Sequence, residues 1–290
     1  MKVNKAVIPA AGLGTRFFPI TKSVPKELLP ILDKPVLHYV VNEALEAGIT
    51  EIIIVTSPGK TALTDYFNPD PKFEYHLAKN GDESLLLEMK RLSSMADIRF
   101  VIQDKPLGLG HAVLVAKSMV GREQFAVMLP DDIVRNDPGV LSQMLDTGEE
   151  IHGGVLAVEQ VSWEEVGKYG VIDPYQLSEK YYQVKHLIEK PDISKAPSSL
   201  AIVGRYILSP NIFDSLECTA PGVKGEIQLT DALCHLLKYQ EIYAYEFAGY
   251  RYDCGTPIGL LEANLGFGLS RRETSSEVRR MLNDIQAGLE

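Results

Sequence analysis

Cysteine is scarce in this chain of 290 residues, and long apolar runs are missing from it. Cys218, Cys234 and Cys254 are odd in number and match neither a C-x-x-C motif nor the spacing of zinc ligands. We therefore expect reduced thiols and a cytoplasmic protein. No apolar run approaches the ~18 residues of a membrane span, and no signal-peptide segment precedes the first expected strand, Lys5–Pro9. No membrane partner is expected.

Positive charge is also in deficit. The chain has 29 basic and 39 acidic residues, which gives a formal net charge of −10. Such a surface repels nucleic-acid phosphates, and no basic stripe or run of stacking aromatics offsets it. We therefore expect no nucleic-acid partner, and any polyphosphate ligand must be bound by a few well-placed cations.

The ordinary composition, with 45% hydrophobic and 23% charged residues, is typical of a globular protein. The length suits one large core, and no repeat or clear linker divides it. We assign residues 1–257 to this core, with ligand sites in both of its halves. Residues 258–290 are predicted to be helical and increasingly charged, so they are expected to form an appended tail or an oligomer contact.

Strand and helix patterns alternate in the first half, which predicts an α/β fold with a mainly parallel, mixed sheet flanked by helices. Strands are predicted at 5–9, 51–56, 98–102 and 125–129, and helices at 36–47, 82–93 and 109–119. The second half is richer in strands. Strands are predicted there at 154–158, 170–172, 182–188, 200–208, 242–247 and 250–252, and helices at 210–216 and 226–239.

Ligands of open α/β sheets lie beyond the carboxyl ends of the strands. In this chain, residues 10–16 follow the first strand, Gln103 follows a later one, and Asp131 follows another. We therefore expect these three positions to meet at one edge of the sheet.

The segment after the first strand reads Ala10-Ala11-Gly12-Leu13-Gly14-Thr15-Arg16, and Pro25-Lys26-Glu27 follows it. Small residues let a backbone approach a ligand closely, and consecutive free N–H groups form a nest for phosphate oxygens. Arg16 and Lys26 would neutralise a polyphosphate bound there. This pattern predicts a nucleotide site.

Two familiar phosphate-binding motifs are excluded. A dinucleotide-binding turn requires a small residue where Phe17 stands. Gly59-Lys60-Thr61 looks like the end of a Walker A motif, but Ile54 occupies the position of its first glycine. A purely structural glycine-rich turn remains an alternative, although it does not account for two basic residues set among Pro19, Pro25 and Pro30.

These features, taken in chain order, resemble the sugar-nucleotide pyrophosphorylases, also called nucleotidylyltransferases, and within that family the branch that uses UTP and glucose 1-phosphate. The resemblance covers roughly residues 5–268. Its landmarks are AAGLGTRFFPITKSVPKELLPILDKPVLHYVV (10–41), PLGLGHAV (106–113), LPDD (129–132), KYGVID (168–173), IEKP (188–191), LAIVGRYIL (200–208), GEIQLTDAL (225–233) and YDCGTP (252–257).

The resemblance implies a Rossmann-like, glycosyltransferase-A-like nucleotidyltransferase fold and a homo-oligomer, either a dimer or a tetramer. It implies a Mg²⁺-dependent transfer from UTP to α-D-glucose 1-phosphate, which yields UDP-glucose and pyrophosphate without a covalent intermediate. Ala11, where thymidylyltransferase relatives usually have glycine, and P-K-E in place of their S-K-Q favour UTP over dTTP.

The resemblance also implies roles for individual residues. Arg16, Lys26, Asp131 and Lys190 are the expected catalytic residues, with Asp131 and Asp253 holding Mg²⁺. The expected nucleotide-binding residues are Ala10, Ala11, Gly12, Gly14, Thr15, Arg16, Lys26, Gln103 and Gly108. The expected sugar-phosphate-binding residues are Asp132, Gly170, Glu189, Lys190 and Val203.

Several of these residues have a plain structural alternative. Asp131 would serve as a helix cap, Asp132 and Asp253 as turn residues, Glu189-Lys190 as a solvated strand end, and Gln103 as an ordinary strand-end amide. His111 is expected to be structural, because an anionic sugar phosphate needs no general base.

Other functions remain open at this point. A dTTP-dependent or other sugar-phosphate nucleotidyltransferase is the nearest alternative. A non-catalytic regulatory paralogue would lack a cation or a metal ligand, yet Arg16, Lys26, Asp131, Lys190 and Asp253 are all present. An NAD(P) oxidoreductase is disfavoured, because Phe17 occupies the position where a dinucleotide-binding turn requires a small residue.

Overall fold

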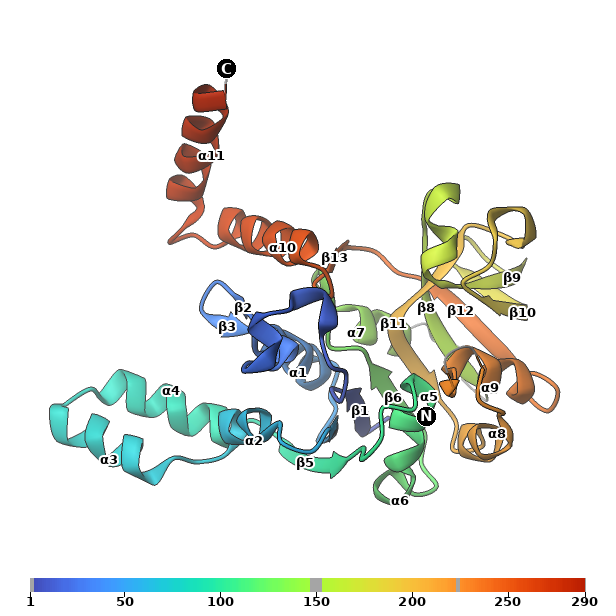
Figure 1. The fold of residues 1–290 in the computed structure, drawn as a ribbon, viewed down its shortest axis with the longest axis horizontal. Helices are drawn as coiled ribbons and strands as arrows, with labels where there is room; N and C mark the ends of the chain where they lie inside the picture. Colours follow the sequence, from blue (N-terminus) through green and yellow to red (C-terminus); the bar gives the residue numbers. More distant parts are fainter. Residues whose placement is uncertain (1–2, 147–152, 223–224, 290) are drawn as a thin grey trace.

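A mixed sheet forms the centre of the protein (Figure 1). The computed structural model describes residues 3–146, 153–222 and 225–289. Within them, nine strands form this sheet in the order β5-β4-β1-β6-β11-β8-β12-β10-β9. Their bounds are β1 (Lys5–Pro9), β4 (Glu51–Thr56), β5 (Asp97–Ile102), β6 (Phe125–Met128), β8 (Gly154–Gln160), β9 (Gly170–Gln176), β10 (Tyr181–Glu189), β11 (Leu200–Leu208) and β12 (Ile242–Glu246).

The two halves of the chain contribute differently to this sheet. Strands β5, β4, β1 and β6 pair in parallel, as the alternation of strands and helices predicted. Strand β11 then joins antiparallel to β6, and among the second-half strands only the pair β8–β12 is parallel within the described sheet. The sheet is therefore mixed, and its parallel part is concentrated in the half that carries the glycine-rich segment.

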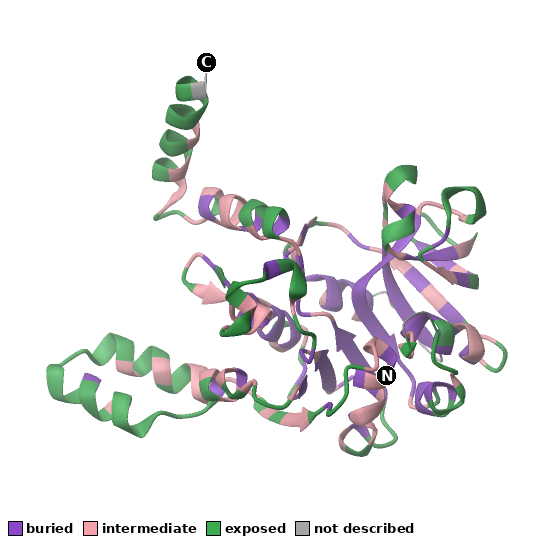
Figure 2. Cartoon of the chain, in the orientation of Figure 1, coloured by how far each residue is buried: buried purple, intermediate pink, exposed green. Residues whose placement is uncertain are grey.

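Two hydrophobic cores lie on opposite faces of the sheet, as the alternation of side chains along each strand requires. Ala6 and Ile8 of β1 belong to one core, whereas Val7 belongs to the other. The first face is covered by α1 (Val36–Glu46), α2 (Thr61–Phe67) and α7 (Val140–Leu145). The second face is covered by α5 (Leu109–Val115), α6 (Lys117–Val120), α8 (Ile212–Cys218) and α9 (Leu229–Leu236). Figure 2 shows the resulting buried centre.

Two short ribbons add to this three-layer core. Strand β7 (Asp132–Arg135) pairs antiparallel with β13 (Tyr250–Asp253), and β2 (Pro30–Ile31) pairs with β3 (Lys34–Pro35). The register of the first ribbon places Asp253 opposite Asp132. Residues separated by more than a hundred positions in the chain therefore meet beside the LPDD segment.

Some predicted elements have different bounds in the structure. The helix predicted at 226–239 begins at Leu229, where its apolar stripe begins, because Gln228 has an extended conformation. The helix predicted at 109–119 is divided into α5 and α6 at Ala116. Helix α3 (Pro71–Asn80) has no counterpart in the sequence analysis, although Asp70 caps it by accepting hydrogen bonds from the N–H groups of Lys72 and Phe73.

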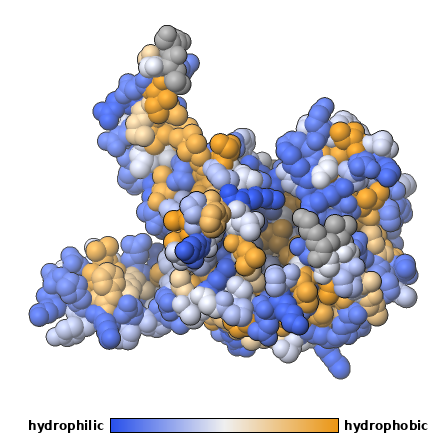
Figure 3. All heavy atoms as spheres, viewed as in Figure 1, coloured by the Kyte–Doolittle hydropathy of each residue, from blue (hydrophilic) through white to orange (hydrophobic). Residues whose placement is uncertain are grey.

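Two helical projections leave the body on the same side (Figure 1). One consists of α3 and α4 (Glu83–Ser93), and the other of α10 (Pro257–Ser270) and α11 (Ser275–Leu289). Ala263 of α10 is fully buried in the first core, whereas Met281 and Ile285 of α11 are exposed. Hydrophobic side chains are visible along this C-terminal arm in Figure 3. Among the described residues, no helix combines the length and the apolar character that crossing a membrane demands.

Candidate active site

The glycine-rich segment begins where β1 ends. The N–H of Ala10 donates to the carbonyl of Val55 (2.7 Å), which extends the contact between β1 and β4 by one residue. Gly14 then adopts a left-handed conformation, with φ of 66°, before a short 3₁₀ turn at Thr15–Phe17. Within the described residues, the backbone N–H groups at positions 11–14 donate no hydrogen bond to the protein. They are available to a ligand, as the nest interpretation requires.

A cavity of about 450 Å³ opens beside this segment. It lies at the carboxyl ends of β1, β5 and β6, the edge predicted for ligand binding. Eight residues predicted for the site line it, namely Ala11, Gly12, Gly14, Thr15, Lys26, Gln103, Gly108 and Asp131. Ala10 is fully buried behind the cavity, so its side chain supports the loop from the core.

Lys26 and Asp131 form an ion pair in the wall of the cavity, with 2.5 Å between Nζ and Oδ2. Burial alone would raise the pKa of Asp131, but the Lys26 ammonium outweighs that effect and holds the pKa below its ordinary value. Burial would lower the pKa of Lys26, and the Asp131 carboxylate likewise outweighs it and raises the pKa. Both groups therefore stay charged at neutral pH. The aliphatic part of Lys26 runs beside the glycine segment, because a Cβ on Gly12 would lie 3.9 Å from its Cε.

Asp253 joins Asp131 across Gly255. A Cβ on Gly255 would lie 2.9 Å from Asp253 Oδ1 and 3.0 Å from Asp131 Oδ2, so the missing side chain leaves space between the two carboxylates. Cys254 N–H donates to the carbonyl of Asp131 (2.8 Å), which ties the two segments together. Arg16 reaches the same place, with 3.5 Å from Nη1 to the carbonyl of Gly255.

This pair of carboxylates fits Mg²⁺, which prefers hard oxygen ligands and is usually held by one or two carboxylates together with substrate phosphates. Among the described residues, no group of three or more His, Cys, Asp or Glu side chains forms a metal site. The protein alone therefore offers an incomplete ligand set, which phosphate oxygens and water would complete.

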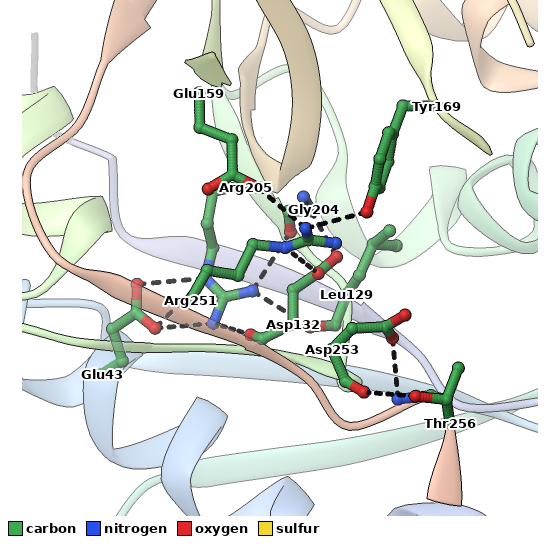
Figure 4. A network of polar contacts seen from close by, with 11 residues as sticks. Glu43, Leu129, Asp132, Glu159, Tyr169, Gly204, Arg205, Arg251, Asp253 and Thr256 are labelled. Atoms are coloured by element: carbon green, nitrogen blue, oxygen red, sulfur yellow. Dashed lines mark hydrogen bonds and ion pairs between the residues drawn. The ribbon is translucent and has the colours of Figure 1, made fainter. Parts of the chain in front are cut away.

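Asp132 lies beneath the cavity and is almost fully buried (8% exposed). Its Oδ1 accepts from Arg251 Nε (2.6 Å), and its Oδ2 accepts from the N–H of Gly204 (3.3 Å), as Figure 4 shows. The protein thus already occupies both carboxylate oxygens. Asp132 begins β7 and is therefore not a turn residue, and its predicted contact with the sugar stays a prediction.

Arg205 binds both ends of the LPDD segment from within the core. Its side chain is fully buried and forms a two-pronged ion pair with Glu43 of α1 (Nη2 to Oε2 2.6 Å, Nε to Oε1 3.0 Å). The same guanidinium donates to the carbonyls of Leu129 (3.0 Å) and Asp132 (2.9 Å), one at each end of the segment (Figure 4). Asp131, which lies between them, is therefore held by a rigid backbone.

Gln103 is 5% exposed and faces the cavity at the end of β5. Its amide nitrogen donates to the carbonyl of Gly108 (3.2 Å) and to Nδ1 of His111 (2.9 Å). His111 thus orients Gln103, and its predicted structural role stays a prediction. A Cβ on Gly108 would lie 2.8 Å from Glu226 Cβ, so the close neighbour that requires glycine here is the segment carrying Glu226.

Apart from Asp132, the residues predicted for the sugar lie on β9, β10 and β11 or directly after β10. Glu189 Oε2 accepts from Thr230 Oγ1 (2.6 Å), and both groups lie beside Gly170, where a Cβ would meet them at 3.1–3.2 Å. Lys190 follows with φ of 46°, a conformation uncommon for lysine, and its Nζ lies 3.2 Å from Glu189 Oε1. The Val203 side chain is in the hydrophobic core, so its predicted sugar contact stays a prediction for the backbone alone.

Tyr169 connects these residues to the LPDD segment. Its carbonyl accepts from the N–H of Lys190 (2.9 Å), and its hydroxyl accepts from Arg251 Nη1 (3.2 Å). Arg251 in turn binds Asp132. The cavity wall contains Lys26 and Asp131 but, among the described residues, neither Glu189 nor Lys190. The structure thus brings seven of the nine predicted nucleotide residues to one cavity. Three of the predicted sugar residues, Gly170, Glu189 and Lys190, lie at the end of the β9–β10 hairpin, which is linked to the LPDD segment through Tyr169 and Arg251.

Sequence reasoning missed the residues that support the site from behind. Glu43, Arg205 and Arg251 carry its ion pairs, and Lys60, which pairs with Glu27, contacts the glycine segment. One signal was available, because Arg205 interrupts an otherwise apolar run, LAIVGRYIL, in a strand that is buried along its whole length.

Comparison with known proteins identifies the family of the chain. Residues 5–268 match the family described as nucleotidyl transferase. The chain belongs to that family. The UTP–glucose-1-phosphate uridylyltransferase of Bacillus subtilis is 47% identical over 277 residues, which cover 96% of this chain and 95% of that protein.

Two solved structures of this nucleotidyl transferase family are also similar to the chain. One is a UDP-glucose pyrophosphorylase complexed with UDP-glucose, with a TM-score of 0.85, 43% identity, and coverage of 93% of this chain and 100% of that one. The other is the UTP-bound enzyme of Acinetobacter baumannii, with a TM-score of 0.88, 38% identity, and coverage of 97% and 99%. The expected fold is thereby confirmed.

Proposed function

We propose that this nucleotidyl transferase converts UTP and α-D-glucose 1-phosphate into UDP-glucose and pyrophosphate. The observation that carries the proposal is the cavity itself, which is lined both by the glycine segment with its free backbone N–H groups and by the Lys26–Asp131 ion pair. The printed names of the relatives support the choice of UTP and glucose 1-phosphate.

The reaction consists of one in-line displacement. A phosphate oxygen of glucose 1-phosphate attacks the α-phosphorus of UTP, a new P–O bond forms, and the bond to the bridging oxygen of the β-phosphate breaks. Because the attacking oxygen is already anionic at neutral pH, no side chain has to remove a proton from it. The protein therefore contributes alignment and charge neutralisation.

Each charged residue has a role in that displacement. The N–H groups of residues 11–14 would bind phosphate oxygens, and Arg16 and Lys26 would neutralise the charge that develops on the departing pyrophosphate. Lys190 would hold the phosphate of the sugar, and Glu189 beside Gly170 would accept hydrogen bonds from the sugar hydroxyls. These roles are proposals that rest on residue type and position.

Asp131 and Asp253 would hold the Mg²⁺ ion, which when bound supplies charge neutralisation and orientation for the phosphate oxygens. The Lys26 ammonium keeps Asp131 ionised, and the absence of a side chain at Gly255 keeps the space between the carboxylates open. The requirement for Mg²⁺ remains part of the proposal.

Gln103 is the proposed contact for uracil. With its amide nitrogen engaged by Gly108 and His111, its amide oxygen is left to accept from the imide N–H of the base. This edge is the same in uracil and thymine, so Gln103 would select against cytosine and adenine, which have no N–H at the corresponding ring position, and not against dTTP.

The test is direct. The protein is incubated with glucose 1-phosphate, Mg²⁺ and each nucleoside triphosphate in turn, and pyrophosphate release is measured. Fast turnover with UTP is expected. Turnover with dTTP and not with UTP would overturn the proposed nucleotide, and no turnover with any triphosphate would favour a regulatory paralogue.

We also propose that the protein forms a homo-oligomer in the cytoplasm. Leu261 of α10 and Met281 and Ile285 of α11 are more than half exposed on the C-terminal arm, and such apolar side chains favour association. The three cysteines are free, which suits a reducing compartment. Light scattering measures the mass in solution, and a monomer would contradict the oligomer.

A further inference from the structure

Lys60 binds the back of the glycine segment, although the motif around it is not a phosphate loop. Its Nζ donates to the carbonyl of Ala10 (2.8 Å) and to the carbonyl of Gly12 (2.6 Å). The same ammonium pairs with Glu27 Oε2 (3.0 Å) and lies 3.3 Å from Glu27 Oε1. One cation therefore joins three pieces of the chain, namely the glycine segment, the turn before α2 and the P-K-E segment.

The contacts of Lys60 with Ala10 and Glu27 are partly buried, whereas its contact with the Gly12 carbonyl is exposed. The Lys60 side chain is 14% exposed, and the Glu27 side chain is 1% exposed. Burial lowers the pKa of Lys60 and raises that of Glu27, and in each case the charge of the partner opposes the shift. Lys26 also favours the charged form of Glu27, but Lys60 is the cation that hydrogen-bonds to it. Removing such a partner from a buried carboxylate is strongly destabilising.

The contacts of Lys60 with the two carbonyls also determine where the neighbouring N–H groups of the glycine segment point. In a planar trans peptide, the carbonyl of one residue and the N–H of the next point in opposite directions. When Lys60 binds the carbonyls of Ala10 and Gly12, the N–H groups of Ala11 and Leu13 must point away from Lys60. These are two of the N–H groups that donate to no described protein atom and that belong to the wall of the cavity.

We propose that Lys60 is a positioning residue, which aims the backbone N–H groups of the glycine segment at the nucleotide by anchoring two of its carbonyls to Glu27. Glu27 is adjacent to Lys26, so the same anchor fixes the cation that pairs with Asp131. The inference rests on the proposed function in one respect, namely that the ligand of the segment is UTP. Lys60 itself touches no substrate in this scheme.

The first test uses Lys60→Met, which keeps the length of the side chain and removes its charge. Lys60→Arg keeps the charge, and Lys79→Met on the exposed face of α3 is the matched control. We expect Lys60→Met to raise the KM for UTP about tenfold while the KM for glucose 1-phosphate changes less than about twofold. Lys60→Arg should bring the KM for UTP part of the way back to the wild-type value, and Glu27→Gln should also raise the KM for UTP. An unchanged KM for UTP in Lys60→Met would overturn the proposal.

The second test needs no substrate. Hydrogen exchange is followed in the ligand-free protein at Ala10, whose N–H binds Val55, and at Phe17, whose N–H binds the carbonyl of Gly14 (3.0 Å). We expect both amides to exchange faster in Lys60→Met than in the wild type or in Lys79→Met. If only the nucleotide-bound protein differed, Lys60 would be contacting the phosphates directly and the positioning role would be wrong. This readout decides the inference even if UTP proves not to be the substrate, because pyrophosphate release by the wild type tests that separately.

Discussion

Arg205 and Glu43 form a buried ion pair, 2.6 Å from Nη2 to Oε2, directly beneath the segment that carries Asp131. Breaking such a pair leaves an uncompensated charge in the core. Glu43→Gln should therefore lower the free energy of unfolding by about 3 kcal/mol in urea denaturation. Glu46→Gln, which changes an exposed carboxylate on the same helix, is the control and should have little effect. A loss below about 1 kcal/mol in Glu43→Gln would show that the pair adds little to stability.

Asp131→Asn should abolish turnover while leaving the fold intact. The substitution removes the charge that pairs with Lys26 and that would hold Mg²⁺, so we expect kcat to fall about a thousandfold or more. Circular dichroism verifies the fold, and Asp65→Asn on the exposed side of α2 is the control. Treatment of the wild type with EDTA should have the same effect and be reversed by Mg²⁺. Near-normal turnover in Asp131→Asn would remove this residue from the metal site.

The nucleotide half of the site could be predicted from the sequence because it follows a general rule of parallel sheets. Strands β1, β5 and β6 read as apolar runs, and the residues after them, including Gln103 and Asp131, meet at the carboxyl edge. No comparable rule applies to antiparallel strands. The positions of Glu189 and Lys190 were therefore expected only through the family resemblance.

The supporting contacts could not be predicted, for a physical reason. Arg205 and Glu43 are 162 positions apart, and Arg251 and Asp132 are 119 positions apart, so no local pattern links them. The shortest ribbon, β2 with β3, has two residues in each strand, which are too few to show a strand period. Lys60 lies in a partial Walker A motif that Ile54 rules out, and no local pattern indicated its contacts with the carbonyls of Ala10 and Gly12.

Lys190→Ala should chiefly weaken the use of glucose 1-phosphate. Its ammonium lies beside Glu189 and is more than half exposed, so it is free to meet an incoming phosphate. Loss of one charge-assisted contact should raise the KM for glucose 1-phosphate about 10- to 100-fold and leave the KM for UTP within about twofold. Steady-state kinetics with each substrate varied in turn measures both values. Lys195→Ala, whose ammonium pairs with Asp192 away from the hairpin end, is the control. Equal effects on the two substrates would contradict the assignment.

His38 of α1 should make stability depend on pH. Its Nδ1 lies 3.0 Å from the hydroxyl of Tyr66, and burial, together with the nearby Lys34, lowers the pKa of His38 to about 4. The folded protein therefore favours neutral His38, whereas the unfolded chain takes up a proton near pH 6.5. The stability that depends on a neutral His38 is therefore fully present above pH 6.5 and is lost as the pH falls toward 4.

The size of this pH effect is limited by water, because the ring of His38 also lines a cavity of about 630 Å³ between α1 and α4. We expect the wild type to lose about 1 kcal/mol more than His38→Gln between pH 7 and pH 5, measured by urea unfolding at each pH. His76→Gln on exposed α3 should follow the wild type. Since glutamine is neutral throughout this range, identical slopes for the wild type and His38→Gln would mean that His38 titrates alike in the folded and unfolded chains.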